Sequence, residues 1–290
     1  MVYSGINEPD VSIVTRGQPG QSAQKLSKIG ELNMAMQNWA GDCAIVTGGA
    51  SGLGAATATR LAEDGMKVAL FDLDAERGQA HAAAIGGVFV KVDVTDPAWV
   101  AKGIDAAEAA FSTPRVLVNC AGIVKGAKTV SRGEAHDPEV FNQVIGINLI
   151  GSFNTASQVA ARMVGAEPLG PDDTRGVIIN TASIAAFDGQ IGQIAYSASK
   201  GGVVGMTLPM ARDLADKGIR VCAIAPGLFR TPLLESLPDD VQASLGAQVP
   251  FPPRLGDPAE FAAMVSHITQ NGMMNGEVIR LDGAIRVAPR

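Results

Sequence analysis

Tyr196 and Lys200 stand four residues apart and form the clearest chemical signal in the sequence. On a helix, side chains at i and i+4 share a face, so the lysine ammonium can lie beside the tyrosine phenol. A phenol with a pKa near 10 must lose roughly 3 pKa units, about 4 kcal/mol, to act as a base at neutral pH. One positive charge about 4 Å away supplies about that much at an effective dielectric constant of 20. We therefore expect Lys200 to lower the pKa of Tyr196.

Ser183 lies thirteen residues before Tyr196, where the segment Asn-Thr-Ala-Ser closes a strand-like run. The spacing Tyr-x-x-x-Lys is common, and taken alone it would indicate a core tyrosine with an incidental surface lysine. Tyr196 is, however, the single tyrosine in the patterned part of the chain, since the other is Tyr3. The serine upstream, a glycine-rich turn at residues 47–54 and the placement at a strand end together favour a catalytic tyrosine over a core tyrosine.

A glycine-rich turn, TGGASGLG from Thr47 to Gly54, follows a strand-like run and opens a helical pattern. Gly48, Gly52 and Gly54 let the backbone turn tightly and approach a pyrophosphate. The helix that follows offers free N–H groups and a partial positive charge to the same phosphates. This context predicts dinucleotide binding, whereas a glycine pattern without a strand and a helix around it could be a plain connection.

Asp72 ends the next strand-like run, eighteen residues beyond Gly54. An acidic side chain at this place can accept hydrogen bonds from the adenosine ribose and would repel a 2′-phosphate, so it favours NAD over NADP. Arg77 is the first basic residue after it that could neutralise such a phosphate. The alternative is that Asp72 caps the next helix, which Asp74 could do equally well.

Polar or small residues also end two further runs, at Asp93-Val94 and at Asn119-Cys120-Ala121-Gly122. In a doubly wound sheet the carboxyl ends of the strands bind the ligand, so these residues are candidates for cofactor contacts. Asp93 could accept from the adenine amino group, and Ala121-Gly122 would let a flat cofactor approach the backbone.

The elements that must position these residues are seven continuous apolar runs separated by helix-length segments. Continuous runs are typical of parallel strands covered on both faces. We therefore predict an α/β fold, a doubly wound parallel seven-stranded sheet (Rossmann fold), in one domain over residues 40–290. Residues 1–39 are polar and turn-rich and are expected to be a leader. The runs are 43–47, 67–72, 88–92, 115–119, 176–180, 219–224 and 277–281.

Composition excludes several classes of protein. The 290 residues carry a net charge of −6, with a pI of about 5.1 and scattered basic residues, which argues against nucleic-acid binding. No apolar run approaches the roughly 20 residues that a membrane span needs. Three well-separated cysteines give no zinc spacing and no disulfide framework. We expect a cytoplasmic protein without metal.

The quoted motifs TGGASGLG, NCAG, NTAS and YSASK, with Pro226-Gly227-Leu228-Phe229-Arg230-Thr231-Pro232, resemble the short-chain dehydrogenase/reductase family over residues 40–290. Within it, INTASIAAFDGQIGQIAYSASKGG, QVPFPPRLGDPAEFA and NGEVIRLDGAIR resemble the type 2 3-hydroxyacyl-CoA dehydrogenases, also described as 17β-hydroxysteroid dehydrogenase type 10. The resemblance implies reversible hydride transfer between NAD and a 3-hydroxyacyl-CoA, giving the 3-oxoacyl-CoA, in a homotetramer.

The resemblance also implies roles for individual residues. Ser183 would hydrogen-bond the substrate oxygen, Tyr196 would transfer its proton, and Lys200 would bind the nicotinamide ribose. Asn148 would hold a water molecule of the proton relay, and Gln193 would contact substrate. The expected cofactor contacts are Gly48, Ser51, Gly52, Leu53, Gly54, Asp72, Asp93, Val94, Asn119, Cys120, Ala121, Gly122, Tyr196, Lys200, Pro226, Gly227, Phe229 and Thr231.

Two other activities, each with its own substrate class, fit the same motifs. An alcohol or steroid dehydrogenase of broad specificity would use the apolar loop after Pro226, with Phe229, Leu233, Leu234 and Leu237. A 3-oxoacyl carrier-protein reductase would usually prefer NADPH, against Asp72. A catalytically idle relative is a third alternative, and its expected mark, a broken Ser-Tyr-Lys set, is absent from the sequence.

The remaining charged residues give weaker signals. Lys125, Lys128 and Arg132 follow NCAG and could receive the phosphates of coenzyme A, although a solvated charged loop would look the same. The three histidines, His81, His136 and His267, lie outside every motif and are expected to be surface or structural residues.

Overall fold

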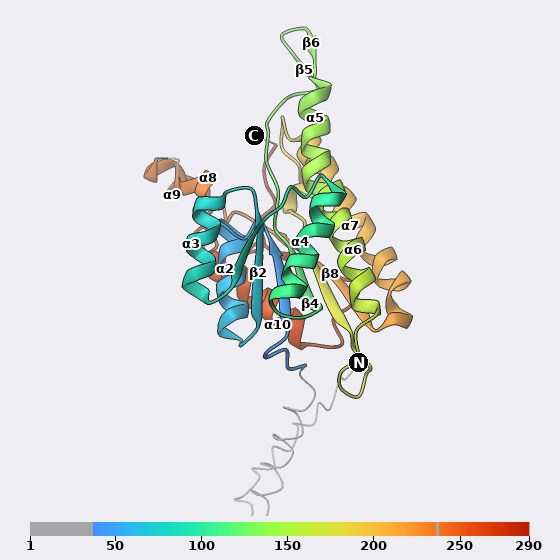
Figure 1. Ribbon diagram of the computed structural model, residues 1–290. Coiled ribbons are helices and arrows are strands. Elements are labelled where there is room, and N and C mark those ends of the chain that lie inside the picture. The colour runs from blue at the N-terminus through green and yellow to red at the C-terminus, as the bar shows by residue number, and fades with distance from the viewer. Residues whose placement is uncertain (1–36, 236–237, 290) are drawn as a thin grey trace, which may run out of the picture. The chain divides into compact units, whose positions relative to one another are not determined.

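The computed structural model describes residues 37–235 and 238–289, and in these ranges seven strands form one parallel sheet (Figure 1). Their order across the sheet is β3-β2-β1-β4-β7-β8-β9, so the chain starts in the middle and winds outward in both directions. The predicted doubly wound sheet is confirmed. The strands are β1 Cys43–Thr47, β2 Lys67–Asp72, β3 Val88–Lys91, β4 Pro114–Asn119, β7 Gly176–Thr181, β8 Ile219–Pro226 and β9 Val278–Leu281.

Helices connect these strands and cover both faces of the sheet. The helices are α2 Gly52–Glu63, α3 Ala75–Ile85, α4 Pro97–Ala110, α5 Pro138–Ile145, α6 Gly151–Val164, α7 Ile194–Asp213, α8 Pro232–Glu235, α9 Asp239–Gly246 and α10 Pro258–Gln270. Short helical turns complete the set: the π-helix η1 Gly146–Ile150 and the 3₁₀ helices η2 Ile184–Ala186 and η3 Ala215–Lys217.

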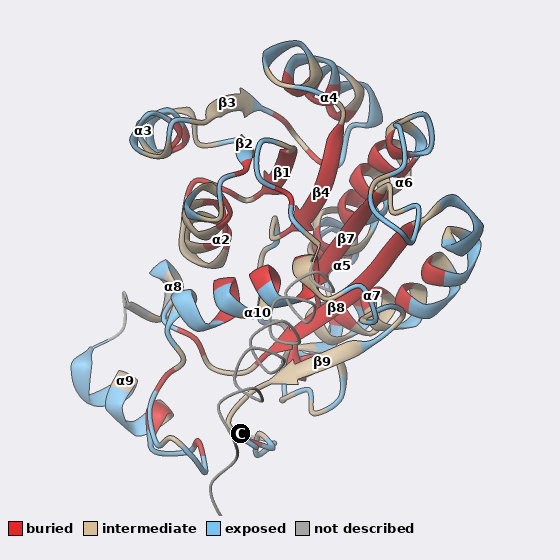
Figure 2. Ribbon diagram, turned by 90° about the horizontal axis from the view of Figure 1, so that it is seen from below, coloured by how far each residue is buried: buried red, intermediate tan, exposed pale blue. Residues whose placement is uncertain are grey.

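The core has two layers because alternate side chains of each strand point to opposite faces. In β1, Ala44 and Val46 pack with residues of α2, α3 and α10 on one face. Cys43 and Ile45 of the same strand pack with residues of α4, α6 and α7 on the other. Figure 2 shows the buried strands between these two helical layers. Both faces of the central strands are therefore covered, which explains their uninterrupted apolar sequence.

Four helices begin at an aspartate whose side chain accepts a hydrogen bond from a first-turn N–H group, namely Asp74, Asp96, Asp137 and Asp257. Proline occupies the first turn of three of them, where its missing N–H group is not needed. These caps fix the points at which the chain leaves each loop and enters a helix.

Strands β1 and β2 have the predicted bounds, and the other five differ from prediction by one or two residues. A two-stranded hairpin, β5 Val130–Ser131 with β6 Glu134–Ala135, was not predicted. Its strands are exposed and very short, so they carry no apolar run. Figure 1 shows this hairpin projecting beyond α5.

Most of the predicted leader, residues 1–36, lies outside the described residues. Its last residues do not: Trp39 is buried against α10, and its indole Nε1 donates to the Thr269 carbonyl oxygen at 2.8 Å. The packed structure therefore includes residues before position 40. In the described part of the chain, no helix is long and apolar enough to cross a membrane.

Candidate active site

The site lies at the carboxyl edge of the sheet, where the loops after six parallel strands come together. The glycine turn leaves β1, and Gly48 has φ +65°. A Cβ atom at position 48 would lie 2.8 Å from the Ala121 nitrogen, so only glycine fits beside the loop after β4. Ser51 precedes α2 without capping it, and the first turn of α2 carries no acidic residue. The backbone N–H groups of this first turn therefore suit an anion such as pyrophosphate.

Asp72 holds the glycine turn against the end of β2. Its Oδ2 accepts from the Ala50 N–H group and its Oδ1 from that of Asp74, each at 3.0 Å. Asp74, not Asp72, caps α3, so the alternative reading of Asp72 as a helix cap is wrong. Arg77 pairs with Asp74 at 2.7 Å, which leaves the carboxylate of Asp72 without that arginine beside it.

His81, which no motif includes, borders the same turn. Its Nδ1 lies 2.9 Å from the Gly49 carbonyl oxygen and its Nε2 lies 3.0 Å from the Thr59 hydroxyl. Because a carbonyl oxygen only accepts, Nδ1 carries the proton and donates. The residue joins α3, α2 and the turn, so of the two predicted possibilities, surface or structural, it is structural. No spacing in the sequence signals this contact.

Asn119 lies beneath the site, not on its surface. Its Nδ2 donates to Asn180 Oδ1 at 2.9 Å, and its Oδ1 accepts from the Thr155 hydroxyl at 2.6 Å. Thr47 supports the next residues, because its hydroxyl oxygen accepts from the N–H groups of Cys120 and Ala121. The side-chain amide of Asn119 is buried and bonded to β7 and α6. This side chain therefore cannot make the expected cofactor contact.

The loops after β3 and β4 place the other predicted cofactor residues. Asp93 Oδ1 accepts from the backbone N–H group and the hydroxyl of Thr95, and Val94 is buried. Cys120 lies beside β7, where the Thr181 hydroxyl donates to its Sγ at 3.5 Å. Burial raises the pKa of the Cys120 thiol to about 11. This thiol is therefore neutral at physiological pH.

Three of the four predicted catalytic residues come together just after β7 and on α7, namely Ser183, Tyr196 and Lys200. Ser183 follows β7 and caps η2, accepting from the Ala185 N–H group at 3.1 Å. The side chain of Ser183 also hydrogen-bonds Tyr196. Lys200 is buried, donates from Nζ to the Thr181 carbonyl oxygen at 2.6 Å, and lies 5.8 Å from the centroid of the Tyr196 ring.

The expected lowering of the Tyr196 pKa is not seen in the structure. Burial raises the pKa of Tyr196, and the hydrogen bond to Ser183 offsets only part of this effect. Lys200 points to the Thr181 carbonyl and is not held against the phenol oxygen, and burial lowers the pKa of Lys200 to about 8. Desolvation thus favours the neutral form of both groups.

Asn148 lies in the π-helical turn between α5 and α6 and is fully buried. Its Oδ1 accepts from the Ile123 N–H group at 2.8 Å, and its Nδ2 donates to the Ser199 hydroxyl at 3.1 Å. It therefore joins the loop after β4 to α7, one residue from Lys200. Gly122 fills the space between them: a Cβ there would lie 3.2 Å from Asn148 Oδ1 and 3.8 Å from Lys200 Nζ.

The loop after β8 covers the glycine turn. A Cβ at Gly52 would lie 3.3 Å from the Pro232 ring and 3.9 Å from the Thr231 methyl group. Phe229 turns away from this contact: it is buried and packs edge-to-face on Phe261. The ring therefore packs against α10, and the predicted cofactor or substrate contact of Phe229 stays a prediction. Leu237 and the Leu233 side chain lie outside the described residues.

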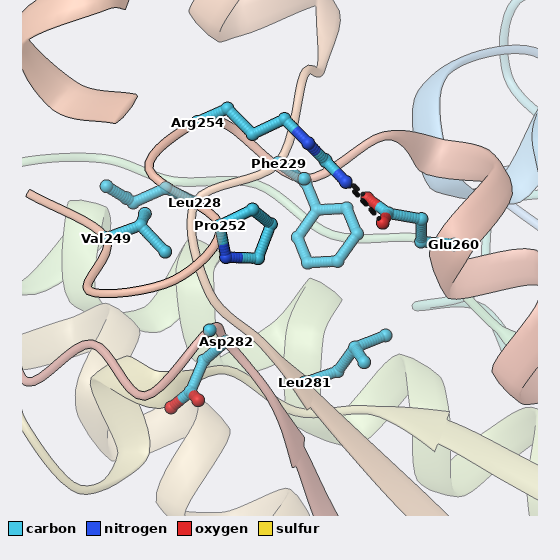
Figure 3. Close-up of a pocket in the computed structure, with 10 residues that line it drawn as sticks. Leu228, Phe229, Val249, Pro252, Arg254, Glu260, Leu281 and Asp282 are labelled. Carbon is cyan, nitrogen blue, oxygen red and sulfur yellow. Dashed lines mark hydrogen bonds and ion pairs between the residues drawn. The ribbon is translucent and has the colours of Figure 1, made fainter. Parts of the chain in front are cut away.

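Phe229 instead lines a pocket of about 130 Å³ between the loop after β8 and the end of β9 (Figure 3). Arg254 and Glu260 form an ion pair at this pocket, at 2.8 Å. None of Ser183, Tyr196 and Lys200 lines it. The pocket is therefore separate from the catalytic set.

The remaining candidates lie in the turn before α7, in the loop after β4 and in the β5–β6 hairpin. Gln193 precedes α7, and its Oε1 accepts from the Gln190 N–H group at 3.0 Å, so this oxygen shapes the turn that leads to Tyr196. Lys125 and Lys128 are exposed, and Lys125 Nζ donates to Gln143 Oε1 at 2.5 Å. Arg132 stands in the turn of the β5–β6 hairpin.

Comparisons with known proteins agree with this geometry. The family model of the short chain dehydrogenases matches residues 42–242. The chain is 55% identical over 250 residues to 3-hydroxyacyl-CoA dehydrogenase type-2 of Homo sapiens, covering 85% of this chain and 95% of that protein. It is 33% identical to a 3-oxoacyl-[acyl-carrier-protein] reductase of Thermotoga maritima, covering 84% and 98%. The crystal structure of 3-hydroxyacyl-CoA dehydrogenase type-2 from Mycobacterium avium is similar, with a TM-score of 0.83, 44% identity and coverage of 86% and 98%.

Proposed function

Because the chain belongs to the short-chain dehydrogenase family and is an oxidoreductase, we propose that it interconverts 3-hydroxyacyl-CoA and 3-oxoacyl-CoA with NAD. The observation that carries the substrate class is the 55% identity to relatives named 3-hydroxyacyl-CoA dehydrogenase type-2, along 95% of their length. The complete Ser183-Tyr196-Lys200 set supports turnover over an idle role.

The glycine turn and Asp72 fit a dinucleotide. Gly48 and Gly52 have positive φ, and the Ala121 backbone packs where a Cβ of residue 48 would be, so this tight turn requires glycine, as a pyrophosphate-binding turn does. Asp72 stands at the end of β2, where its carboxylate would accept from the adenosine ribose and repel a 2′-phosphate. When bound, NAD supplies the hydride acceptor and NADH the hydride donor.

The side chains of the site would handle the proton and the substrate oxygen. Ser183 and Tyr196 would bind this oxygen, and Tyr196 would take or give its proton. Lys200 would hold the nicotinamide ribose and, with its pKa near 8, exchange a proton close to neutral pH. The carbonyl oxygen of Asn148 accepts from the Ser152 hydroxyl, and its second lone pair would hold a water molecule that leads protons to solvent.

Absorbance at 340 nm with acetoacetyl-CoA tests the proposal, comparing NADH with NADPH. We expect rapid oxidation of NADH and little oxidation of NADPH. Turnover of a steroid or simple alcohol with NAD, without turnover of the acyl-CoA, would indicate an alcohol or steroid dehydrogenase. The proposed roles of Ser183, Tyr196 and Lys200 would then remain. Preference for NADPH would contradict the role of Asp72.

The basic loop is the proposed site for the phosphates of coenzyme A. Lys125 and Lys128 are exposed in the loop after β4 and carry the charge that such phosphates need. The double substitution Lys125→Glu with Lys128→Glu should raise the Michaelis constant for acetoacetyl-CoA severalfold and leave that for NADH unchanged. An unchanged Michaelis constant for acetoacetyl-CoA would show that these lysines are solvated and do not bind the phosphates of coenzyme A.

We also propose a homotetramer in a reducing compartment such as the cytoplasm. An interface between subunits requires exposed apolar side chains. About half of the side chain is exposed at Ile150, which precedes α6, and at Phe153 in α6. The same holds for Ile194 and Leu208 in α7. Cys43, Cys120 and Cys222 form no disulfide. Light scattering would measure the assembly directly.

A further inference from the structure

Residues 184–193 link Ser183, which follows β7, to α7, which carries Tyr196. The inner part is anchored in the core, since Ile184 and Ala185 are buried. The outer part is not, since Phe187 and Ile191 are each 49% exposed. Polar contacts must therefore hold the outer part in place.

Arg280, on β9, supplies the centre of these contacts. Its Nη2 donates to Asp188 Oδ2 at 2.7 Å, and its Nε donates to Asp282 Oδ2 at 2.8 Å. The guanidinium also lies 5.2 Å from the centroid of the Phe187 ring, within reach of a cation–π attraction. One side chain thus joins β9 to a residue 92 positions earlier in the sequence.

The contacts of Arg280 are shielded from solvent. The side chains of Arg280, Asp188 and Asp282 are 20%, 23% and 8% exposed. Charge pairs at this depth are screened less by salt and water than pairs on the surface. Arg286, which is 61% exposed, reaches Asp282 at 3.2 Å from the solvent side.

The C-terminal segment adds two hydrogen bonds to the same stretch. Gln190 Nε2 donates to the Ala288 carbonyl oxygen, and the Ile191 N–H group donates to that of Pro289, each at 3.0 Å. Residues 282–289 therefore run along the segment that leads from Ser183 to Tyr196.

The other end of the cluster reaches the loop after β8. A Cβ at Gly227 would lie 2.9 Å from the Asp282 Cα, and the Gly227 N–H group donates to the Leu281 carbonyl oxygen at 2.9 Å. Arg280 thus stands between the segment after Ser183 and the loop that covers the glycine turn.

We propose that Arg280 is a positioning residue that, by holding Asp188 and Asp282 together, fixes Ser183 relative to Tyr196 and so sets the turnover rate. The proposal rests on the proposed function, because it takes Ser183 as the hydroxyl that binds the substrate oxygen. Small misplacements of reacting groups, on the order of 1 Å, can lower rates about 10²-fold. Arg280 itself bonds neither the glycine turn, Asp72 nor the loop after β8, which only its partner Asp282 and the neighbouring Leu281 contact, so cofactor binding should change less than kcat.

Arg280→Gln and Asp188→Asn test the proposal on the full chain. We expect each to lower kcat by about tenfold or more, while the Michaelis constant for NADH changes less than twofold. Arg280→Lys should recover part of the lost kcat, because an ammonium can pair with one carboxylate but lacks the fork that holds two. A kcat within twofold of the wild type in a folded Arg280→Gln protein would overturn the proposal.

Arg162→Gln is the matched control. Arg162 also joins two carboxylates, Asp105 and Glu108, each at 2.6 Å, but it does so between α6 and α4. Its loss should lower stability without changing kcat more than twofold. If it lowers kcat as much as Arg280→Gln, the effect is general destabilisation and the proposal is wrong.

Amide hydrogen exchange gives a second readout that needs no substrate. The Ile191 N–H group should lose protection in Arg280→Gln and Asp188→Asn and keep it in Arg162→Gln. Unchanged protection in both cluster variants would overturn the proposal. If the wild type turned over no substrate, the proposed function would fail, and the exchange data would still decide whether Arg280 orders this segment.

Discussion

At the scale of single residues, burial sets the protonation of Tyr196 and Lys200. It raises the pKa of Tyr196 and lowers that of Lys200 to about 8, so the phenol is neutral and the ammonium holds its proton weakly. A donor whose pKa lies near the working pH exchanges protons readily in both directions. The pair therefore suits a reversible reaction.

Tyr196→Phe removes the hydroxyl that is proposed to transfer the proton and leaves the ring in place. Turnover should fall by about 10²–10⁴-fold, the usual contribution of a positioned acid–base group. NADH binding, measured by fluorescence titration, should stay within twofold of the wild type because the ring still fills its place. Retained turnover would dismiss Tyr196 as the acid–base residue.

Asp72→Asn separates the charge of this side chain from its hydrogen bonds. The amide oxygen can still accept from the Ala50 N–H group, so the glycine turn should keep its shape. The loss of charge should narrow the preference for NADH over NADPH by about tenfold, since one repulsion with the 2′-phosphate disappears. The ratio of kcat/KM for the two cofactors measures this, and an unchanged ratio would remove Asp72 from cofactor selection.

At the scale of elements, α10 shows how local chemistry fixes a helix. Asp257 accepts from a first-turn N–H group, and Glu260 accepts from the Asp257 N–H group at 2.8 Å, forming a reciprocal cap. Glu260 also pairs with Arg254 on both oxygens, and this pairing lowers the pKa of Glu260 to about 2. The start of α10 is thereby fixed to the loop that contacts Phe229.

Asp257→Ala should lower the free energy of unfolding by about 1 kcal/mol, the usual effect of losing such a cap. Asp257→Asn should keep most of this free energy, because its amide oxygen can still accept the hydrogen bond. Urea denaturation measures both changes. Equal stability of the alanine variant and the wild type would show that the tertiary contacts of α10 make the cap redundant.

The predictability of the elements from sequence depends on the range of the interactions that form them. The apolar runs in the sequence predict the buried strands. The shared face of Tyr196 and Lys200 follows from the helical repeat alone. The β5–β6 hairpin and the π-helical turn carry no such pattern. The pair of Arg280 with Asp188 was also not predicted, because it joins residues that only the folded sheet brings together.

At the scale of the whole molecule, the burial of Lys200 lowers the stability of the fold. The folded-state pKa of Lys200, about 8, lies below the ordinary value of 10.5. Between these pH values the unfolded chain holds more protons, so this residue makes stability rise with pH through that window. Below pH 8 its charged form costs the folded state about 3 kcal/mol.

Lys200→Met should therefore raise the free energy of unfolding at pH 7 by about 1–2 kcal/mol, after allowing about 1 kcal/mol for the lost hydrogen bond to Thr181. Turnover should be lost in the same protein. Thermal unfolding of both proteins from pH 7 to 10 measures the difference, which should shrink as the pH rises above 8. A methionine variant less stable than the wild type at pH 7 would contradict this.

The π-helical turn at Gly146–Ile150 sets the direction in which the Asn148 side chain points. Such a turn holds one residue more than regular α-helix, and each residue rotates a helix by about 100°. Deleting one residue here would restore the α-helical repeat and swing Asn148 out of line with Ile123 and Ser199. No exchange of one side chain for another reproduces that rotation. A chain with an unbroken helix here would need one added residue before an asparagine at this place could reach both Ile123 and Ser199.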